Sequence, residues 1–381
     1  MARINRSSEE ALASAPIGIL MLKLAVPAVA AQVINMLYNI VDRIYIGHIP
    51  GDGDLALTGV GVCLPLILIV SAFAALVASG GAPRASIYMG KQDHDTAEKI
   101  LGGCFALQLA VSALLTAVLL LWSRDLLLAF GASENTIGYA ASYMQIYAVG
   151  TVFVQLTLGL NAFITAQGFA KIGMRTVLIG AVANIVLDPI MIFGLLGCPA
   201  MGISGAAAAT VIGQIIAMFL ALYFNLKKNH DVSINMRGFR PDMRIIRIIY
   251  SVGLPSIIMQ SITSVMTYGM NLILISFSAT AVTVLGIYFK LQSFIFMPIF
   301  GLNNGMIPII AYNDGARSKK RIMDTAKLSI AIAISIMLLG LAVFQVFTPQ
   351  LLMLFNASDS LLEMGIPALR TISLSFLFAG Y

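Results

Sequence analysis

The amino-acid sequence predicts an all-α protein that crosses a membrane many times, and three observations support this fold class. Hydrophobic residues make up 59% of the chain and charged residues only 10%. A soluble domain has about 25% charged residues and lacks repeated apolar stretches of about 20 residues, the length of a helix that crosses a bilayer. Such stretches recur along this chain, and proline and glycine motifs of its first half recur in its second half.

Ten apolar stretches are predicted to be membrane-spanning helices, because each is bounded by charged residues or by clusters of Gly, Pro and Asn. In chain order they cover residues 18–46, 55–82, 98–122, 137–164, 174–196, 203–226, 246–275, 280–311, 324–346 and 364 to the end. The last stretch stops abruptly. We therefore expect a sequence that is truncated in its tenth helix and lacks two further helices.

The positions of Lys and Arg predict how the chain is oriented. With the N-terminus in the cytoplasm, 19 of the 23 Lys and Arg residues lie on the inner side and three on the outer side. Cytoplasmic loops carry such an excess. We expect a multi-pass protein of the plasma (inner) membrane with a cytoplasmic N-terminus. The remaining residue, Lys290, lies inside the eighth stretch, where it either reaches the interface or lines a second-half cavity.

An internal repeat relates the two halves. Pro27 recurs as Pro255, 228 residues later, and the Gly80-Gly81-Ala82-Pro83 motif recurs as Asn304-Gly305-Met306-Ile307-Pro308, 225 residues later. Six stretches separate the copies, so both halves enter the membrane from the same side, as in parallel-repeat transporters. The predicted organisation is an N-terminal six-helix bundle at 1–226, a cytoplasmic linker at 227–245 and an incomplete C-terminal bundle at 246–381.

Two acids inside first-half stretches indicate a cation site. Asp42 lies near the outer end of the first stretch, and Asp188 shares a helix face with Asn184 in the fifth. With Thr210 of the sixth stretch, they fall at nearly one depth in the outer half of the membrane, at about 1.5 Å per residue. Buried neighbouring carboxylates cannot both ionise cheaply, so we predict that they share a proton or hold Na⁺. The alternative is that each polar side chain only forms a hydrogen bond with a neighbouring helix and holds the helices together.

Several other functions are not supported by the sequence. It contains no HExxH, P-loop or GxSxG pattern, so we expect neither enzymatic activity nor a cofactor. The net charge of +6 does not indicate a nucleic-acid partner, because the basic residues lie in short loops where membrane insertion places them.

Pro189 directly follows Asp188 and leaves the backbone carbonyl of Ile185 without its helical hydrogen-bond donor, which places an unpaired carbonyl oxygen near the predicted cation site.

Five short motifs carry a resemblance to a known family. They are Pro27 with Tyr38-Asn39-Ile40-Val41-Asp42 and Gly47; Gly80-Gly81-Ala82-Pro83 with Gly90-Lys91; Leu160-Asn161-Ala162 with Gln167-Gly168; Asn184 with Asp188-Pro189; and Gly202-Ile203-Ser204-Gly205-Ala206-Ala207. From about Pro16 to Tyr381 the sequence resembles the multidrug and toxic compound extrusion (MATE) family. This resemblance implies a V-shaped fold of two six-helix bundles around a central cavity.

The resemblance also implies a function and a set of residues. Members exchange organic, usually cationic and lipophilic, compounds for H⁺ or Na⁺ by alternating access. The residues that match the family's cation site are Asp42, Asn184, Asp188 and Thr210. Weaker matches to the lining of the substrate cavity are Asn35, Tyr38, Asn39, Tyr143 and Asn161. Some members carry an acid in the seventh span; this sequence has Gln260 and Asn271 there and no acid, which favours coupling through the first bundle alone.

The expected mechanism begins when a cation from outside neutralises Asp42 and Asp188 and bends or shifts the first span near Pro27, so that the substrate leaves outward. Pro189 and Pro255 are expected to take part in the conformational change. We expect small-molecule substrates and a monomer in the lipid bilayer. Two alternatives stay open, a flippase for a lipid-linked oligosaccharide and a non-transporting membrane scaffold.

Overall fold

The computed structural model describes residues 3–228, 232, 243–355 and 358–380, and the regular structure in these ranges is entirely helical. The long helices of the first half are α2 (Ile17–Gly47), α3 (Gly53–Gly80), α5 (His94–Ala129), α6 (Ile137–Ala166), α7 (Ala170–Phe193) and α8 (Ile203–Tyr223). Those of the second half are α9 (Met243–Ile275), α10 (Ala279–Gly315), α11 (Lys319–Val346) and α13 (Asp359–Ser373). The shorter helices are α1 (Arg3–Ser14), α4 (Ala82–Gly90), α12 (Thr348–Met353) and α14 (Phe376–Gly380).

Nine helical segments within the described residues are long and apolar enough to cross a membrane. They coincide with nine of the ten predicted stretches, and the remaining stretch, residues 246–275, forms α9. The predicted all-α, multi-pass fold class is therefore confirmed. The side chains of Gln260 and Asn271 in α9, which the sequence singled out, lie outside the described residues.

The tenth predicted stretch differs from the observed helices at both ends. Its helix begins at Asp359 rather than at residue 364, because Ser358 and Asp359 are residues that helix N-termini favour. It ends at Ser373, and a separate helix begins at Phe376. The carbonyl of Ser375 accepts hydrogen bonds from the N–H groups of Phe378 and Ala379, which starts the new helix.

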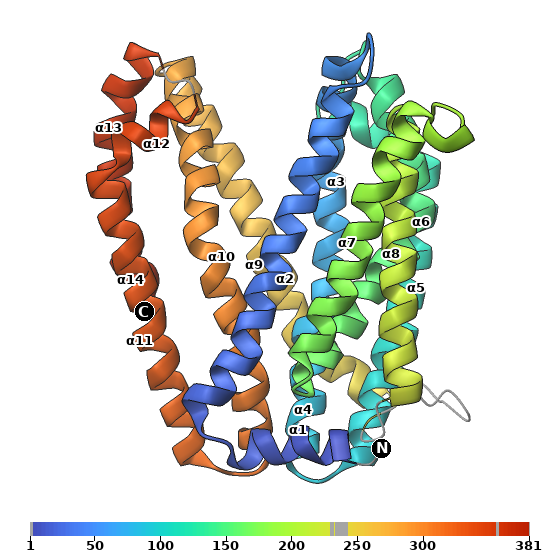
Figure 1. The fold of residues 1–381 in the computed structure, drawn as a ribbon, viewed down its shortest axis with the longest axis vertical. Helices are drawn as coiled ribbons and strands as arrows, with labels where there is room; N and C mark the ends of the chain where they lie inside the picture. The colour runs from blue at the N-terminus through green and yellow to red at the C-terminus, as the bar shows by residue number, and fades with distance from the viewer. Residues whose placement is uncertain (1–2, 229–231, 233–242, 356–357, 381) are drawn as a thin grey trace.

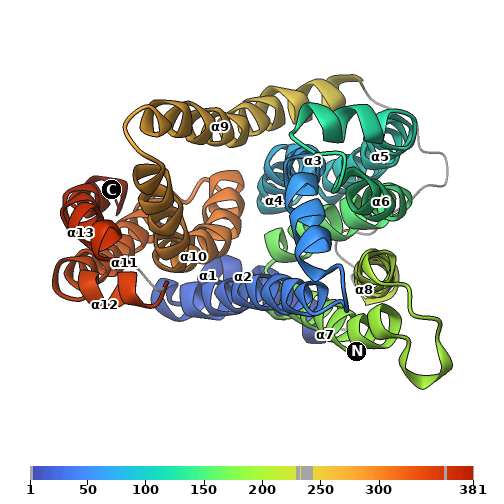
Figure 2. The same cartoon turned by 90° about the horizontal axis from the view of Figure 1, so that it is seen from above.

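The helices form two groups that are close together at one end of the molecule and apart at the other (Figure 1). Helices α10, α11 and α13 lie on one side, and α3 and α5 to α8 lie on the other. Helix α2 packs against both α7 and α10 and therefore contacts the two groups. Seen from above, α9 runs along one flank and packs on α3 (Figure 2). This arrangement confirms the V shape that the resemblance implied, closed at the end that carries α1.

Glycines allow helices of different halves to touch backbone to backbone. A Cβ atom on Gly80 of α3 would lie 2.4 Å from a backbone oxygen of α9, and one on Gly253 of α9 would lie 2.4 Å from a backbone oxygen of α3. In a second pair, a Cβ on Gly305 of α10 would lie 2.7 Å from the backbone of Ala25 in α2. Gly80 and Gly305 are 225 residues apart, and Ala25 and Gly253 are 228 apart. The two helix contacts therefore occupy equivalent positions of the repeat.

Buried apolar side chains form a core at the closed end that draws on both halves of the chain. It contains Leu24 and Leu76 from the first half, and Ile249 and Leu302 from the second. One separate cluster fills the first half toward the open end, and another lies in the second half. The predicted linker of residues 227–245 falls largely outside the described residues, so the division of the chain into two bundles at that point stays a prediction.

Candidate cation site

The junction between α7 and α8 positions the first part of the site. Gly194 ends α7 in the left-handed region, at φ +74°, where glycine avoids the strain of a side chain. The N–H groups of Met201 and Gly202 then donate back to the carbonyls of Met191 (2.9 Å) and Ile192 (3.1 Å). These bonds hold the start of α8 beside the end of α7, so the two helices run antiparallel from a fixed point.

Close packing of α7 on α8 depends on small residues. A Cβ on Gly213 of α8 would lie 2.8 Å from the carbonyl oxygen of Gly180 in α7 and 3.2 Å from the Cβ of Asn184. The helices approach this closely because neither glycine carries a side chain. Their proximity brings the amide of Asn184 to the face of α8 that carries Thr210.

Asn184 connects the polar groups of these two helices. Its Nδ2 donates to Oδ1 of Asp188 at 3.1 Å and to Oγ1 of Thr210 at 3.4 Å. Asp188 is fully buried, and Asn184 is 2% exposed. Since an amide between a carboxylate and a hydroxyl fixes the orientation of both, this side chain sets the geometry of the site.

Asp42 reaches the same site from α2, which packs along α7. Its carboxyl group is buried and interacts electrostatically with that of Asp188. Tyr143 of α6 is buried, interacts electrostatically with Asp42 and is also close to Thr210. The structure therefore brings together Asp42, Asn184, Asp188 and Thr210, the four residues that the sequence singled out for a cation site.

The site is rich in buried oxygen acceptors. Within the described residues, Oδ1 of Asp42, Oδ1 of Asn184 and Oδ2 of Asp188 have no hydrogen-bond partner. No Lys or Arg in the part of the chain that the structure describes forms a salt bridge with either acid. Buried carboxylates are costly without a compensating positive charge. The donor set consists of oxygen atoms, which suit Na⁺, and a proton on either carboxyl group also supplies the missing charge.

The predicted cavity residues of α2 lie on the same side of the helix as Asp42. Asn35, Tyr38 and Asp42 are spaced three and four residues apart, which places them on one face. Tyr38 interacts electrostatically with Asp42. Asn39 is exposed, and its Nδ2 donates to the backbone carbonyl of Asn35 at 2.6 Å. The role of these residues in lining a substrate cavity stays a prediction.

Asn161 lies apart from the other candidate residues. Its Oδ1 accepts a hydrogen bond from Thr176 Oγ1 at 2.6 Å. Thr176 precedes Asp188 by twelve residues of α7, which corresponds to about 18 Å along the helix axis. The structure thus places Asn161 toward the opposite end of α6 and α7, away from Asp42 and Asp188, and its contribution to the cavity also stays a prediction.

Tyr147 is a neighbour of the site that the sequence did not single out. Its ring stacks on that of Tyr143, with centroids 6.3 Å apart and planes 15° apart, and it interacts electrostatically with Tyr38. Its spacing of four residues from Tyr143 was the available signal, because residues four apart share a helix face. Three tyrosines from α2 and α6 therefore form a cluster, and two of them, Tyr38 and Tyr143, interact with Asp42.

The three prolines and the lysine that the sequence singled out lie within long helices. Pro27, Pro189 and Pro255 are inside α2, α7 and α9, each of which continues through its proline. Lys290 of α10 is exposed, with its ammonium 5.8 Å from the ring centroid of Phe355. The contact with Phe355 decides neither of the two roles considered for Lys290.

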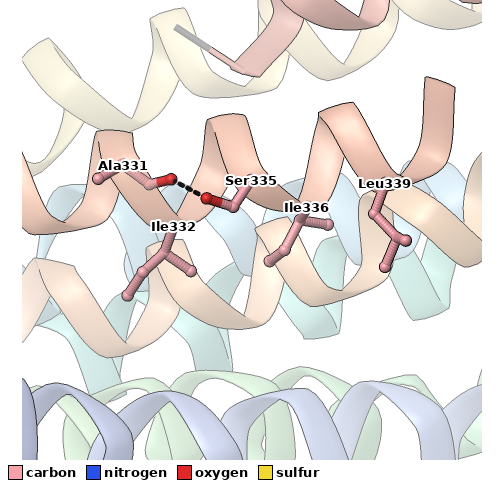
Figure 3. Close-up of a pocket in the computed structure, with 5 residues that line it drawn as sticks. All are labelled: Ala331, Ile332, Ser335, Ile336 and Leu339. Atoms are coloured by element: carbon pink, nitrogen blue, oxygen red, sulfur yellow. Dashed lines mark hydrogen bonds between the residues drawn. The ribbon is translucent and has the colours of Figure 1, made fainter. Parts of the chain in front are cut away.

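A groove of about 350 Å³ lies on α11 (Figure 3). It is lined by Ala331, Ile332, Ser335, Ile336 and Leu339. Ser335 Oγ in this groove donates a hydrogen bond to the backbone carbonyl of Ala331 at 2.8 Å. The groove contains none of the predicted cavity or cation-site residues.

Comparison with known proteins identifies the family. The MatE family model matches residues 27–190 and 255–381, which together form most of the chain. The chain belongs to the MatE family. The two matched segments begin at Pro27 and Pro255, the prolines that the internal repeat relates, and the first includes the α2 and α7 residues of the site.

Relatives of this MatE chain include two multidrug export proteins, both called MepA. The protein from Staphylococcus haemolyticus (strain JCSC1435) is 28% identical over 371 residues, covering 94% of this chain and 80% of the relative. The protein from Staphylococcus aureus (strain N315) is 26% identical over 362 residues, covering 94% of this chain and 78% of the relative.

Solved MATE structures share the fold. A MATE transporter in the bent conformation matches with a TM-score of 0.90 at 24% identity, covering 98% of this chain and 81% of that one. An outward-facing multidrug resistance MATE transporter matches with a TM-score of 0.88 at 24% identity, covering 98% of this chain and 82% of that one. A transporter of the MOP superfamily from Pyrococcus furiosus Vc1 matches with a TM-score of 0.88 at 25% identity, covering 98% of this chain and 82% of that one. The reversed polarity of its binding pocket suggests a different function for that transporter.

Proposed function

We propose that this MatE protein is a secondary active transporter that exports organic compounds in exchange for H⁺ or Na⁺. The observation that carries the proposal is the pair of buried acids Asp42 and Asp188 in a site of unpaired oxygen acceptors, with Asp188 joined through Asn184 to Thr210. The relatives named as multidrug export proteins support the direction and the kind of transport. The protein acts as a monomer in the plasma membrane, with its N-terminus in the cytoplasm, and needs no cofactor besides the coupling ion.

The substrate is a lipophilic organic cation. Tyr38 and Tyr143 interact with Asp42, and the ring of Tyr147 stacks on that of Tyr143. A cation is attracted both by aromatic faces and by carboxylates. A coupling ion that neutralises the acids removes part of this attraction. Substrate and coupling ion therefore compete, which is the requirement for exchange.

The exchange cycle starts from the form in which the halves meet at the end that carries α1 (Figure 1). The predicted orientation makes this the cytoplasmic end. H⁺ or Na⁺ enters from outside and binds at Asp42 and Asp188. Helix α2 then shifts near Pro27 relative to α7, and the substrate leaves outward. The coupling free energy cannot exceed the difference in ion affinity between the outward-open and inward-open states.

Ethidium efflux from cells that produce the protein tests this function, with the Na⁺ and pH gradients collapsed separately. Efflux should stop when one of the two gradients is removed, which identifies the coupling ion. Efflux that continues without either gradient, or no efflux at all, would contradict antiport and favour the flippase or the scaffold.

The Asp42→Asn variant tests the site itself. The amide cannot bind a proton or offer a full negative charge, so ethidium efflux should fall by about tenfold or more at unchanged protein level, as loss of the coupling ion requires. The matched control is Asp54→Asn, which changes an exposed acid in the first turn of α3. Equal efflux in the two variants would refute the role of Asp42.

A further inference from the structure

The N-terminal helix α1 lies across the closed end of the molecule, beneath the ends of the long helices (Figure 1). It is separated from α2 by Ala15 and Pro16. Its side chains are largely polar, yet Leu12 is fully buried. A polar surface helix with one fully buried leucine is docked at a defined place, and its contacts reach both halves of the chain.

Two contacts join α1 to the first half. Ser8 Oγ donates to the backbone carbonyl of Gln167, in the turn between α6 and α7, at 2.7 Å. Glu9 Oε1 lies 3.9 Å from Nδ1 of His94, the first residue of α5. Gly168 adjoins the Ser8 contact with φ +88°, and a Cβ there would lie 2.4 Å from Ser8 Oγ. The turn therefore leaves room for α1 only because residue 168 is glycine.

Two other contacts join α1 to the second half. The carbonyl of Leu12, in the last turn of α1, accepts hydrogen bonds from Asn313 Nδ2 of α10 and from a guanidinium nitrogen of Arg321 in α11, both at 3.0 Å. The last four carbonyls of a helix have no partner within it, and a positive group near them also favours the helix dipole. Arg321 and Asn313 thus hold the C-terminal end of α1.

The side chain of Leu12 is buried in the core at the closed end. That core includes Leu76 and Phe163 from the first half, and Ile309 and Tyr312 from the second. Leu12 therefore packs where the two halves meet, between the two sets of polar contacts.

We propose that α1 is a strap that ties the cytoplasmic ends of the two halves together and stabilises the outward-open form. The inference rests on the proposed alternating access, because opening toward the cytoplasm must separate these ends. A helix bonded to Gln167 on one half and to Asn313 and Arg321 on the other cannot keep both sets of bonds when the halves part. One set must break in each transport cycle, so α1 sets the balance between the two forms.

A thiol introduced by Ser86→Cys reports the opening. Ser86 is fully buried, and its Oγ lies 3.4 Å from the carbonyl oxygen of Pro308, on the other half. A maleimide added to inside-out vesicles reaches this position only when the cytoplasmic ends separate. The exposed Cys198 is removed by Cys198→Ser, and Cys104, which belongs to the core shared by the two halves, is removed by Cys104→Ala. The fully buried Cys63, in the separate core of the first half, stays as an internal indicator of unfolding.

Two sets of substitutions cut the strap at opposite ends. Ser8→Ala with Glu9→Gln removes the first-half contacts, and Asn313→Ala with Arg321→Gln removes the second-half contacts. The control Lys320→Gln removes an exposed charge next to Arg321. Each cut should raise the labelling rate at position 86 by about threefold or more, as a shift toward the inward-open form requires, whereas the control should not.

The two cuts combined distinguish a strap from independent local bonds. If α1 acts as a strap, breaking its contacts at one end already releases it. The variant with both sets of substitutions should then be labelled at position 86 no faster than the faster of the two single sets. If the contacts act independently, the accelerations from the two sets should multiply. Multiplied rates, no acceleration, acceleration in Lys320→Gln, or reaction of Cys63 would each overturn the strap. Ethidium efflux by the unaltered protein is measured separately, so failure of the strap and failure of the transport function are distinguishable.

Discussion

At the level of single residues, the site depends on one amide that orients a carboxylate and a hydroxyl. Asn184 donates to Asp188 and Thr210, while its own Oδ1 stays available in the site. An amide can do this because it carries two donor hydrogens and an acceptor oxygen. The arrangement explains why a neutral residue lies between an acid and a hydroxyl, since it positions acceptor atoms without adding a third negative charge.

Thr210→Val tests the hydroxyl of this network. The substitution keeps the shape of the side chain but removes the acceptor for Asn184, and a typical hydrogen bond is worth about 1 kcal/mol, or about fivefold in affinity. The Na⁺ or H⁺ concentration that half-saturates ethidium efflux should rise by about this factor. Thr210→Ser keeps the hydroxyl and should behave like the unaltered protein; a similar loss in both variants would show that shape matters and not the hydrogen bond.

At the level of helices, the approach of α7 to α8 determines whether the site can form. Gly180 and Gly213 face each other at a distance that admits no side chain, and Asn184 follows Gly180 by one turn. In a bilayer, where apolar side chains gain little by leaving lipid, such close contacts are a main source of helix association. The glycines therefore contribute to the site although they bind nothing.

Gly213→Val should separate α7 from α8. The added methyl groups would overlap the carbonyl of Gly180, and overpacking of this kind costs about 1–3 kcal/mol, or a few degrees in the melting temperature. Cation-dependent efflux should fall with it, because Asn184 moves away from Thr210. Gly61→Val, at a position in α3 with no atom within 4 Å, is the control, and an equal drop in its melting temperature would refute the packing explanation.

At the level of the whole molecule, the two halves are joined by equivalent helix contacts. The α3–α9 contact uses Gly80 and Gly253, and the α2–α10 contact uses Gly305 against Ala25. Both lie toward the closed end, where α1 also binds (Figure 1). The two halves are therefore apart at one end of the molecule and closely packed at the other, as alternating access requires.

Gly253→Val tests this seal. A side chain at residue 253 would overlap the backbone of Leu76, so the end that carries α1 should no longer close and ethidium efflux should fall. Gly286→Val in α10 is the control, because nothing lies within 4 Å of that position. Normal efflux in Gly253→Val would show that the contact can rearrange without loss of transport.

Labelling of Cys198 tests the orientation of the chain. Cys198 is exposed in the connection between α7 and α8, which the positive charges of the other loops predict to lie outside. A membrane-impermeant maleimide should label it in intact cells. A thiol introduced by Ser318→Cys, in the turn between α10 and α11, should react only after permeabilisation; the opposite pattern would reverse the predicted orientation.

The sequence by itself determined the fold class and the apolar helices long enough to cross a membrane, and it predicted the depth of the acids. These properties are local: bilayer thickness sets the length of an apolar helix, and the rise per residue places Asp42, Asp188 and Thr210 at one height. The shared helix face of Asn184 and Asp188 was predictable for the same reason.

Only the tertiary structure decided which residues face each other. It stacked Tyr147 on Tyr143, placed Asn161 beside Thr176, and brought Leu12 of α1 to Arg321. Helix neighbours and the rotation of each helix about its axis depend on packing between segments far apart in the chain, such as Gly253 against Leu76. Sequence periodicity describes one helix at a time, so it cannot reveal contacts that arise when two helices meet.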